Sequence, residues 1–171
     1  MGVDVGQARV GVALCDREGI LATPLKTLRR DSKNNSDIRV LLKLVEVHSV
    51  VEIFLGLPMT MRGGQSQSTR MALDYAHTLE QQLSIPLWLI DERLTTVKAK
   101  RTLHEAGVSS RHFKAMVDQV AAVNILQIAL DALKAGNPQV GQSLAAYTAR
   151  TSSDNSRYGL ENKDTENPSE R

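Results

Sequence analysis

Four acidic residues, far apart in the sequence, occupy positions where a carboxylate could do chemistry. Asp4 lies inside a short apolar run, and Asp91 and Glu92 directly follow another. Asp118 heads an apolar stripe at helical spacing, which indicates a helix face turned toward other structure. A carboxylate among apolar residues is costly to bury unless a metal or a cation holds it, so these positions are candidates for metal ligands or ion-pair partners.

Each acid also has a structural interpretation that requires no chemistry. Asp4 could bond the backbone of the turn that follows it, and Asp118 could form a salt bridge inside the protein. Asp91 and Glu92 could stabilise the positive end of the next helix. Side chains along a strand alternate between faces, so only one of Asp91 and Glu92 can share a face with Asp4. The spacing alone leaves open which one does.

Taken together, two strand-borne acids and one helix-borne acid could converge at one edge of a sheet. Oxygen ligands without clustered His or Cys favour Mg²⁺ or Mn²⁺ over Zn²⁺. Carboxylates gathered in this way would otherwise repel one another and raise at least one pKa. A pair of divalent ions about 3.5–4 Å apart supports in-line cleavage of a phosphodiester bond. The pattern therefore predicts a metal-dependent nuclease.

The elements that must position these acids follow from the hydrophobic periodicity. Three strands joined by short turns must pair antiparallel, and two later strands separated by helices should add in parallel through right-handed crossovers. The strands are expected at residues 1–5, 9–14, 20–28, 50–55 and 86–90. Ser36 is expected to cap the first helix, and later helices are expected to begin at Ser66, near Thr96 and at Ser109 or Ser110. This order predicts an α/β protein with a mixed five-stranded sheet and helices on both faces, as in the ribonuclease-H-like fold.

Composition sets the remaining bounds. The chain has 171 residues, and its hydrophobic content of 42% excludes a wholly disordered chain. Its single cysteine excludes an intrachain disulfide. Residues 1–150 are expected to form one domain, and the polar residues 151–171 a disordered tail. Without a signal peptide or an apolar run of membrane length, a soluble cytoplasmic protein with no membrane partner is expected.

Basic residues near the acids are candidates for holding nucleic-acid phosphates. The expected tail is acidic, which leaves residues 1–150 with an excess of four positive charges. The candidates are Arg9, Arg93, Lys98 and Lys114. Arg9 and Arg93 flank the acids, whereas Lys98 could simply belong to a solvated helix face. Aromatic residues make up only 4% of the chain, so recognition of bases by stacking is not favoured.

The sequence is similar to the YqgF/RuvX family, and the similarity spans nearly all of residues 1–136. The matching segments are GVDVG at 2–6, RVGVA at 9–13, LGLPM at 55–59 with Gly63, Gly64 and Ser66, DERLTTV at 91–97 and KAMVDQVAA at 114–122. The resemblance implies a ribonuclease-H-like nuclease whose metal-binding acids are Asp4, Glu92 and Asp118. It is the resemblance, and not the spacing, that selects Glu92 over Asp91. Family members usually carry a few more apolar residues before the first aspartate, so a short first strand and a natural start further upstream are both expected.

The family implies two functions with the same chemistry. The leading expectation is cleavage that matures the 5′ end of pre-16S rRNA in ribosome biogenesis, and the alternative is a Holliday junction resolvase acting on branched DNA. A resolvase should be a homodimer because it cuts two strands symmetrically, and the sequence leaves monomer and homodimer open. Two further alternatives are a non-catalytic RNA-binding module and an ATP-handling protein of the actin and sugar-kinase type. Asp4, Gly6 and Gly11 are similar to the phosphate hairpin of that last group, which uses two such domains.

Overall fold

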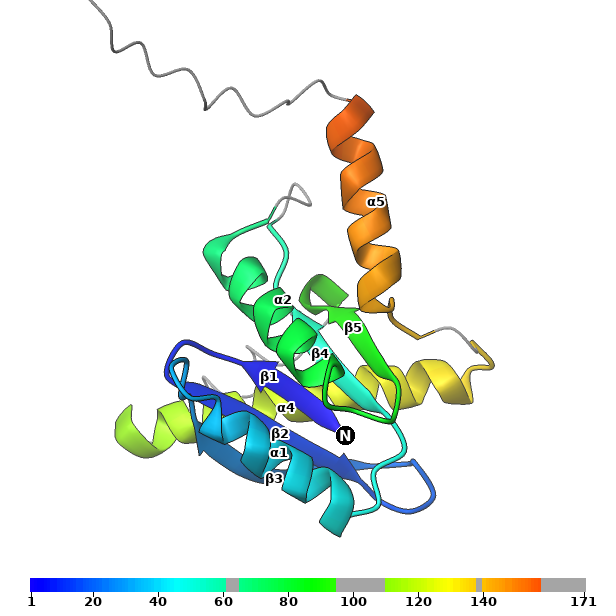
Figure 1. Ribbon diagram of the computed structural model, residues 1–171. Coiled ribbons are helices and arrows are strands. Elements are labelled where there is room, and N and C mark those ends of the chain that lie inside the picture. Colours follow the sequence, from blue (N-terminus) through cyan, green and yellow to red (C-terminus); the bar gives the residue numbers. More distant parts are fainter. Residues whose placement is uncertain (61–64, 95–109, 138–139, 158–171) are drawn as a thin grey trace, which may run out of the picture.

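The computed structural model describes residues 1–60, 65–94, 110–137 and 140–157 of the chain (Figure 1). Within these ranges, the side chains of residues 94, 110–118 and 154–157 are not described. The helix expected from Thr96 to Gly107 therefore lies outside the described residues. No helix in the described part of the chain is long and apolar enough to cross a membrane.

The described strands form one five-stranded sheet in the order β3-β2-β1-β4-β5. Strands β1 (Gly2–Val5), β2 (Arg9–Cys15) and β3 (Ala22–Arg29) pair antiparallel, as their short connections require. Strands β4 (Ile53–Leu57) and β5 (Leu87–Asp91) add in parallel beyond β1. The predicted mixed sheet, with antiparallel strands first and parallel strands after, is confirmed.

Helices cover both faces of this sheet (Figure 1). Helices α1 (Ser36–Val47) and α2 (Gln67–Glu80) pack on one face, and α4 (Ser110–Lys134) packs on the other. Helix α5 (Leu144–Arg157) joins the α1/α2 side through Leu144 and Tyr147, and its later turns project away from the sheet. The alternation of β1 divides the two faces: Val3 and Val5 enter the α1/α2 core, whereas Gly2 faces α4.

Helix α4 crosses the sheet antiparallel to β1, in close contact with its backbone. The carbonyl oxygen of Ala122 lies 2.5 Å from the point where a Cβ on Gly2 would stand, so a side chain there would displace the helix. Further along α4, Gln127 donates to the carbonyl of Ile20, in the turn between β2 and β3. This turn lies beyond the amino end of β1, because Gly2 pairs with Ala13 near the end of β2. The earlier turns of α4 therefore lie toward the carboxyl end of β1, where Asp4 is found.

Three predicted boundaries are wrong. Strand β4 begins at Ile53 and runs through Gly56 to Leu57, because pairing with β1 and β5, and not β-branched composition, sets its limits; Val51 is 77% exposed. The N-cap of α1 is Asn35, in a left-handed conformation with φ 52°, because the hydroxyl of Ser36 donates to Asp31 at 2.6 Å instead.

The third correction concerns the carboxyl-terminal boundary. Helix α5 crosses residue 150, so residues 151–157 are helical and not part of a disordered tail. The polar composition of this segment hides the helix, since Tyr147 anchors its first two turns against the core and the side chains of residues 148–153 are mostly exposed. Residues 158–171 lie outside the described ranges.

The predicted cap of α2 and the predicted irregularity at Pro24 agree with the structure. Ser66 caps α2 in a reciprocal arrangement with Thr69, in which each side chain bonds the backbone N–H of the other. The interruption expected at Pro24 is a register shift opposite residues 12 and 13 of β2, and β3 is also an edge strand.

Candidate active site

The carboxylates of Asp4 and Glu92 meet on the face of the sheet that α4 covers. Asp4 lies near the carboxyl end of β1, and Glu92 opens a short 3₁₀ turn, η1 (Glu92–Leu94), directly after β5. The two side chains are partly buried and lie within hydrogen-bonding distance of each other. The chain thus brings together two of its three proposed metal ligands from strands that are not neighbours in the sheet.

Gly56 makes this meeting possible. It lies in β4, between β1 and β5, and pairs with Ile90 of β5. A Cβ on Gly56 would stand 2.6 Å from Oε1 of Glu92 and still closer to Cδ1 of Ile125. The absence of a side chain on β4 leaves the gap through which the Glu92 carboxylate reaches Asp4.

The proximity of the two carboxylates changes the pKa of Glu92. Burial raises the pKa of Glu92 to about 7, with further contributions from the charge of Asp4, a hydrogen bond to Asp4 and the charge of Asp91. Two carboxylates in contact disfavour each other's ionisation in a partly buried site, and an opposite charge nearby would offset this repulsion. A divalent cation is such a charge.

The backbone of α4 brings Asp118 to the level of Asp4. Asp118 lies one turn before Ala122, a rise of about 6 Å along the helix. Because Ala122 packs on Gly2 and α4 runs antiparallel to β1, this rise matches the two strand residues, about 6.7 Å, between Gly2 and Asp4. The side chain of Asp118 lies outside the part of the chain that the structure describes.

Asp91 has a different environment from its neighbour. Strand alternation turns it to the α5 side of the sheet, where the guanidinium of Arg93 bonds both of its oxygens at 2.5–3.0 Å and the Arg93 backbone N–H donates to Oδ1 at 3.0 Å. These bonds, and the charges of Arg93 and Arg150, lower the pKa of Asp91 despite partial burial. The structure thus resolves the choice that strand alternation left open, since Glu92 and not Asp91 joins Asp4.

The four candidate phosphate-binding residues are distributed unevenly. Arg9 follows the tight turn after β1, where its carbonyl accepts from Gly6 at 2.8 Å, and its side chain is partly exposed. Arg93 is bound to Asp91 as described above, although 39% of its side chain is exposed. Lys114 lies in the first turns of α4 without a described side chain, and Lys98 falls outside the described residues.

The described carboxylates fit a divalent metal ion. They supply hard oxygen donors, they lie in contact, and the raised pKa of Glu92 shows that the site disfavours a second negative charge in the absence of a cation. Among the residues whose side chains are described, no three His, Cys, Asp or Glu side chains form a metal-binding group, and Asp118 is not among those residues.

The role of Gly56 does not follow from the sequence pattern, which predicts a strand over residues 50–55. A glycine inside an apolar run is a known signal for close approach by another group. In this chain that signal lies in the segment Ile53–Leu57, one residue beyond the strand end that composition predicts.

The strand order and the paired acids at the sheet edge define a ribonuclease-H-like protein. The structure of Thermus thermophilus RuvC in complex with a Holliday junction substrate has the same architecture, with a TM-score of 0.51 over 80% of this chain and 94% of that chain. The two sequences are 12% identical, and the likeness establishes the fold alone.

A family comparison gives the particular relationship. The model of RuvX, described as Holliday junction resolvase, matches residues 1–132, and this chain belongs to the RuvX family. A protein of Mycobacteroides abscessus is 48% identical over 128 residues, which cover 74% of this chain and 77% of the relative. A protein of Mycolicibacterium smegmatis is 48% identical over 138 residues, covering 79% and 81%. Both are named "Putative pre-16S rRNA nuclease". The predicted family and its nuclease class are confirmed.

Proposed function

We propose that this chain is a divalent-metal-dependent nuclease that cleaves phosphodiester bonds of structured RNA, and that its substrate is the 5′ region of pre-16S rRNA. The contact between Asp4 and Glu92, with the pKa of Glu92 raised to about 7, is the observation that carries the proposal. The names of the relatives from Mycobacteroides abscessus and Mycolicibacterium smegmatis support the choice of substrate. The expected cytoplasmic location is part of this proposal.

Asp4, Glu92 and Asp118 would hold Mg²⁺ or Mn²⁺. When bound, such ions lower the pKa of an attacking water and stabilise the negative charge on the leaving 3′ oxygen. Because the pKa of Glu92 is raised to about 7 without metal, a bound cation would favour its ionised form, and metal binding should release protons near neutral pH. Ile125, packed over Gly56, closes one side of the site with an apolar wall.

The remaining chain supplies orientation. The carboxylate of Glu92 is confined to the gap above Gly56, and the short strand β1 fixes Asp4 beside it. The partly exposed Arg9 follows the turn next to Asp4, and we assign it to the substrate phosphate. Arg93, Lys98 and Lys114 complete the proposed set of phosphate contacts.

Cleavage of two labelled substrates tests the proposal. One is a precursor RNA with the 5′ extension of 16S rRNA and the other is a four-way DNA junction, each incubated with Mg²⁺, Mn²⁺ or EDTA. We expect metal-dependent cleavage of the RNA. Asp4→Asn, Glu92→Gln and Asp118→Asn should each lower the rate by more than the roughly 10–100-fold that loss of a group supporting a metal ligand costs.

Matched controls separate these acids from carboxylates in general. Asp131→Asn changes an exposed acid on the same helix as Asp118, and Glu80→Gln changes an exposed glutamate at the end of α2. Both controls should cleave at the wild-type rate. Cleavage that persists in EDTA, or in all three site variants, would exclude the mechanism. Preferential cleavage of the four-way junction, together with a dimer in sedimentation, would show that the substrate is branched DNA and not RNA.

A further inference from the structure

A polar groove opens on the face of the sheet opposite the Asp4–Glu92 pair. It has a volume of about 960 Å³ and lies between the turn after β1, the segment that leads into α1, and helix α2. Its polar lining includes Gln7, Arg30, Asn35, Gln67, Ser68 and Arg70. We call this region the α1–α2 groove.

Arg30 is held in a fixed orientation at the α1–α2 groove. Its Nη1 donates to both oxygens of Asp37, at 3.0 and 3.1 Å, and its guanidinium lies 4.9 Å from the centre of the Tyr75 ring. The Asp37 side chain is fully buried, and that of Arg30 is 11% exposed. In the described part of the chain, the side-chain hydrogen bonds of Arg30 leave from Nη1, and the residue lines the groove.

Binding of an anion explains this arrangement better than a gain in stability alone does. A buried ion pair loses much of its Coulombic gain to the desolvation of both charges. What the Asp37–Arg30 pair does secure is orientation, because an arginine fork that is already ordered loses less entropy when it binds a phosphate. The pair therefore indicates a contact residue that is prepared for an anionic ligand.

The opposite wall of the groove adds donors from the first turns of α2. Gln67, Ser68 and the exposed Arg70 line the wall there, at the positive end of the helix dipole. The only acid facing the groove among its lining residues is Asp74, one helical turn beyond Arg70 and further from the turn after β1. The donor-rich end of the groove is thus the end nearest Gln7.

The donor-rich end also lies next to the candidate active site. Gln7 is three residues beyond Asp4, so their Cα atoms are at most about 10 Å apart, about three base-pair steps of a duplex. The turn between them is tight, with the Gly6 N–H donating to the Arg9 carbonyl at 2.8 Å. The start of α1 and the start of α2 lie at this same edge of the sheet (Figure 1).

We propose that the α1–α2 groove binds the sugar–phosphate backbone of the substrate strand as it leaves the active site over the turn after β1. The inference rests on the proposed nuclease function and extends it, because it assigns a path to the nucleic acid beyond the cleaved bond. Arg30 and Arg70 contact phosphates from the two walls, and the amide and hydroxyl groups between them bond the backbone without reading the bases.

Binding of labelled RNA by fluorescence anisotropy tests the groove. The measurement is made in EDTA, with a precursor RNA that extends well past the cleavage position on both sides and with a short RNA that ends close to it. Arg70→Glu is exposed and should not disturb the fold. We expect it to lower affinity for the long RNA about tenfold, to reduce the salt slope by about one, and to leave affinity for the short RNA unchanged.

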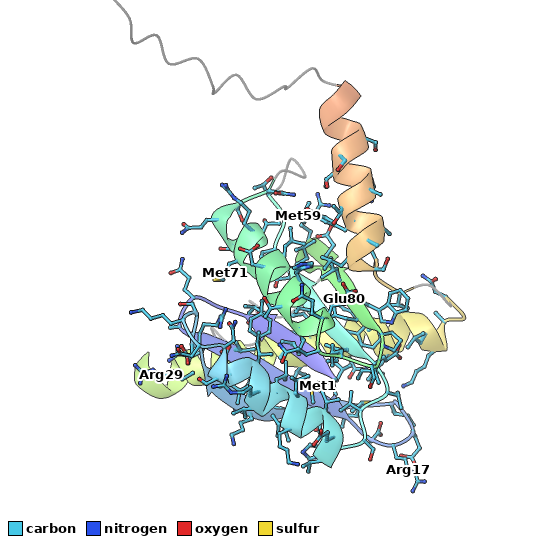
Figure 2. All side chains as sticks on the ribbon, viewed as in Figure 1. Met1, Arg17, Arg29, Met59, Met71 and Glu80 are labelled. Atoms are coloured by element: carbon cyan, nitrogen blue, oxygen red, sulfur yellow. The ribbon has the colours of Figure 1, made fainter. Side chains whose placement is uncertain are left out.

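Two further variants complete the design. Arg30→Gln combined with Asp37→Asn removes the guanidinium without leaving a buried carboxylate unpaired, and should weaken binding of the long RNA as Arg70→Glu does. Arg17→Glu is the matched control: the residue is exposed and lies at the opposite end of the molecule from Arg29 and from Met71, which lines the groove (Figure 2). Arg17→Glu should bind both RNAs like the wild type.

The outcomes separate the groove from the nuclease. Equal weakening by Arg70→Glu and Arg17→Glu would overturn the groove, because it would show general electrostatic attraction only. Equal loss for long and short RNA would also overturn it, since the contact would then belong to the active site. If the wild type cleaves RNA with metal while Arg70→Glu binds normally, the groove alone is wrong. If the wild type neither binds nor cleaves RNA or the four-way junction, the proposed function itself is wrong.

Discussion

Oε1 of Glu92 lies 2.6 Å from the point where a Cβ on Gly56 would stand. The carboxylate therefore occupies space that any other residue at position 56 would fill. Strand β4 separates β5 from β1, and a side chain on it would stand between Glu92 and Asp4. The contact between these two carboxylates depends on a residue that contributes no functional group.

Gly56→Ala should separate Glu92 from Asp4 and strain the core. The new methyl would overlap Oε1 of Glu92 and Cδ1 of Ile125, and overpacking of this kind costs about 1–3 kcal/mol of stability. We expect a lower free energy of unfolding in urea and a loss of metal-dependent cleavage. Adding Ile125→Val removes one of the two overlaps, so the double variant should regain stability without regaining activity. Full activity in Gly56→Ala would show that the Glu92 position is not required.

The stability of the metal-free protein should fall as pH rises through neutrality. Glu92 has a pKa of about 7 in the folded protein against 4.5 in the unfolded chain, so the folded state binds the extra proton between these values. Stability from this group is complete below about 4.5 and is lost as pH rises through about 7, by up to about 3 kcal/mol. Urea unfolding in EDTA across this range measures the effect. Glu92→Gln should remove this part of the pH dependence, whereas Glu80→Gln should leave it intact.

Asp91→Asn should separate the two adjacent acids functionally. Asp91 is paired with Arg93, and both side chains are partly exposed, so the pair contributes no more than about 1 kcal/mol to stability. We expect metal binding in calorimetry, and cleavage, to remain close to wild type. The corresponding change at Glu92 should abolish both. Loss of metal binding in Asp91→Asn would mean that the pair with Arg93 breaks when metal binds.

Removing only one partner of the Arg30–Asp37 pair should lower the free energy of unfolding. Arg30→Leu leaves the fully buried Asp37 carboxylate without its charged partner, for which we expect a loss of about 3–5 kcal/mol in free energy of unfolding. Arg30→Gln with Asp37→Asn replaces charges by hydrogen-bonding amides and should cost clearly less. If both proteins unfold at the same urea concentration, the pair does not stabilise the fold and only the Arg30 side chain packing matters.

Local patterns were sufficient to predict most of the framework. The short turns after Val5 and Cys15 leave no room for a crossover, so the antiparallel order of β1, β2 and β3 follows from the sequence. Ser66, the capping residue of α2, also follows from the local sequence, because a cap depends on a neighbour three residues away. The end of β4 and the start of α5 do not follow from local patterns, because pairing with other strands and packing of Tyr147 define them.

The sequence by itself determined that Asp4 faces away from Val3 and Val5, that only one of Asp91 and Glu92 could join it, and that oxygen ligands would dominate any metal site. These conclusions follow from strand alternation and side-chain chemistry, which act over a few residues. Only the tertiary structure decided that Glu92 joins Asp4, that Gly56 leaves room for it, and that Asp91 binds Arg93. The physical reason is that these relationships depend on how β1, β4 and β5 are aligned side by side, and that alignment is set by the packing of the whole sheet.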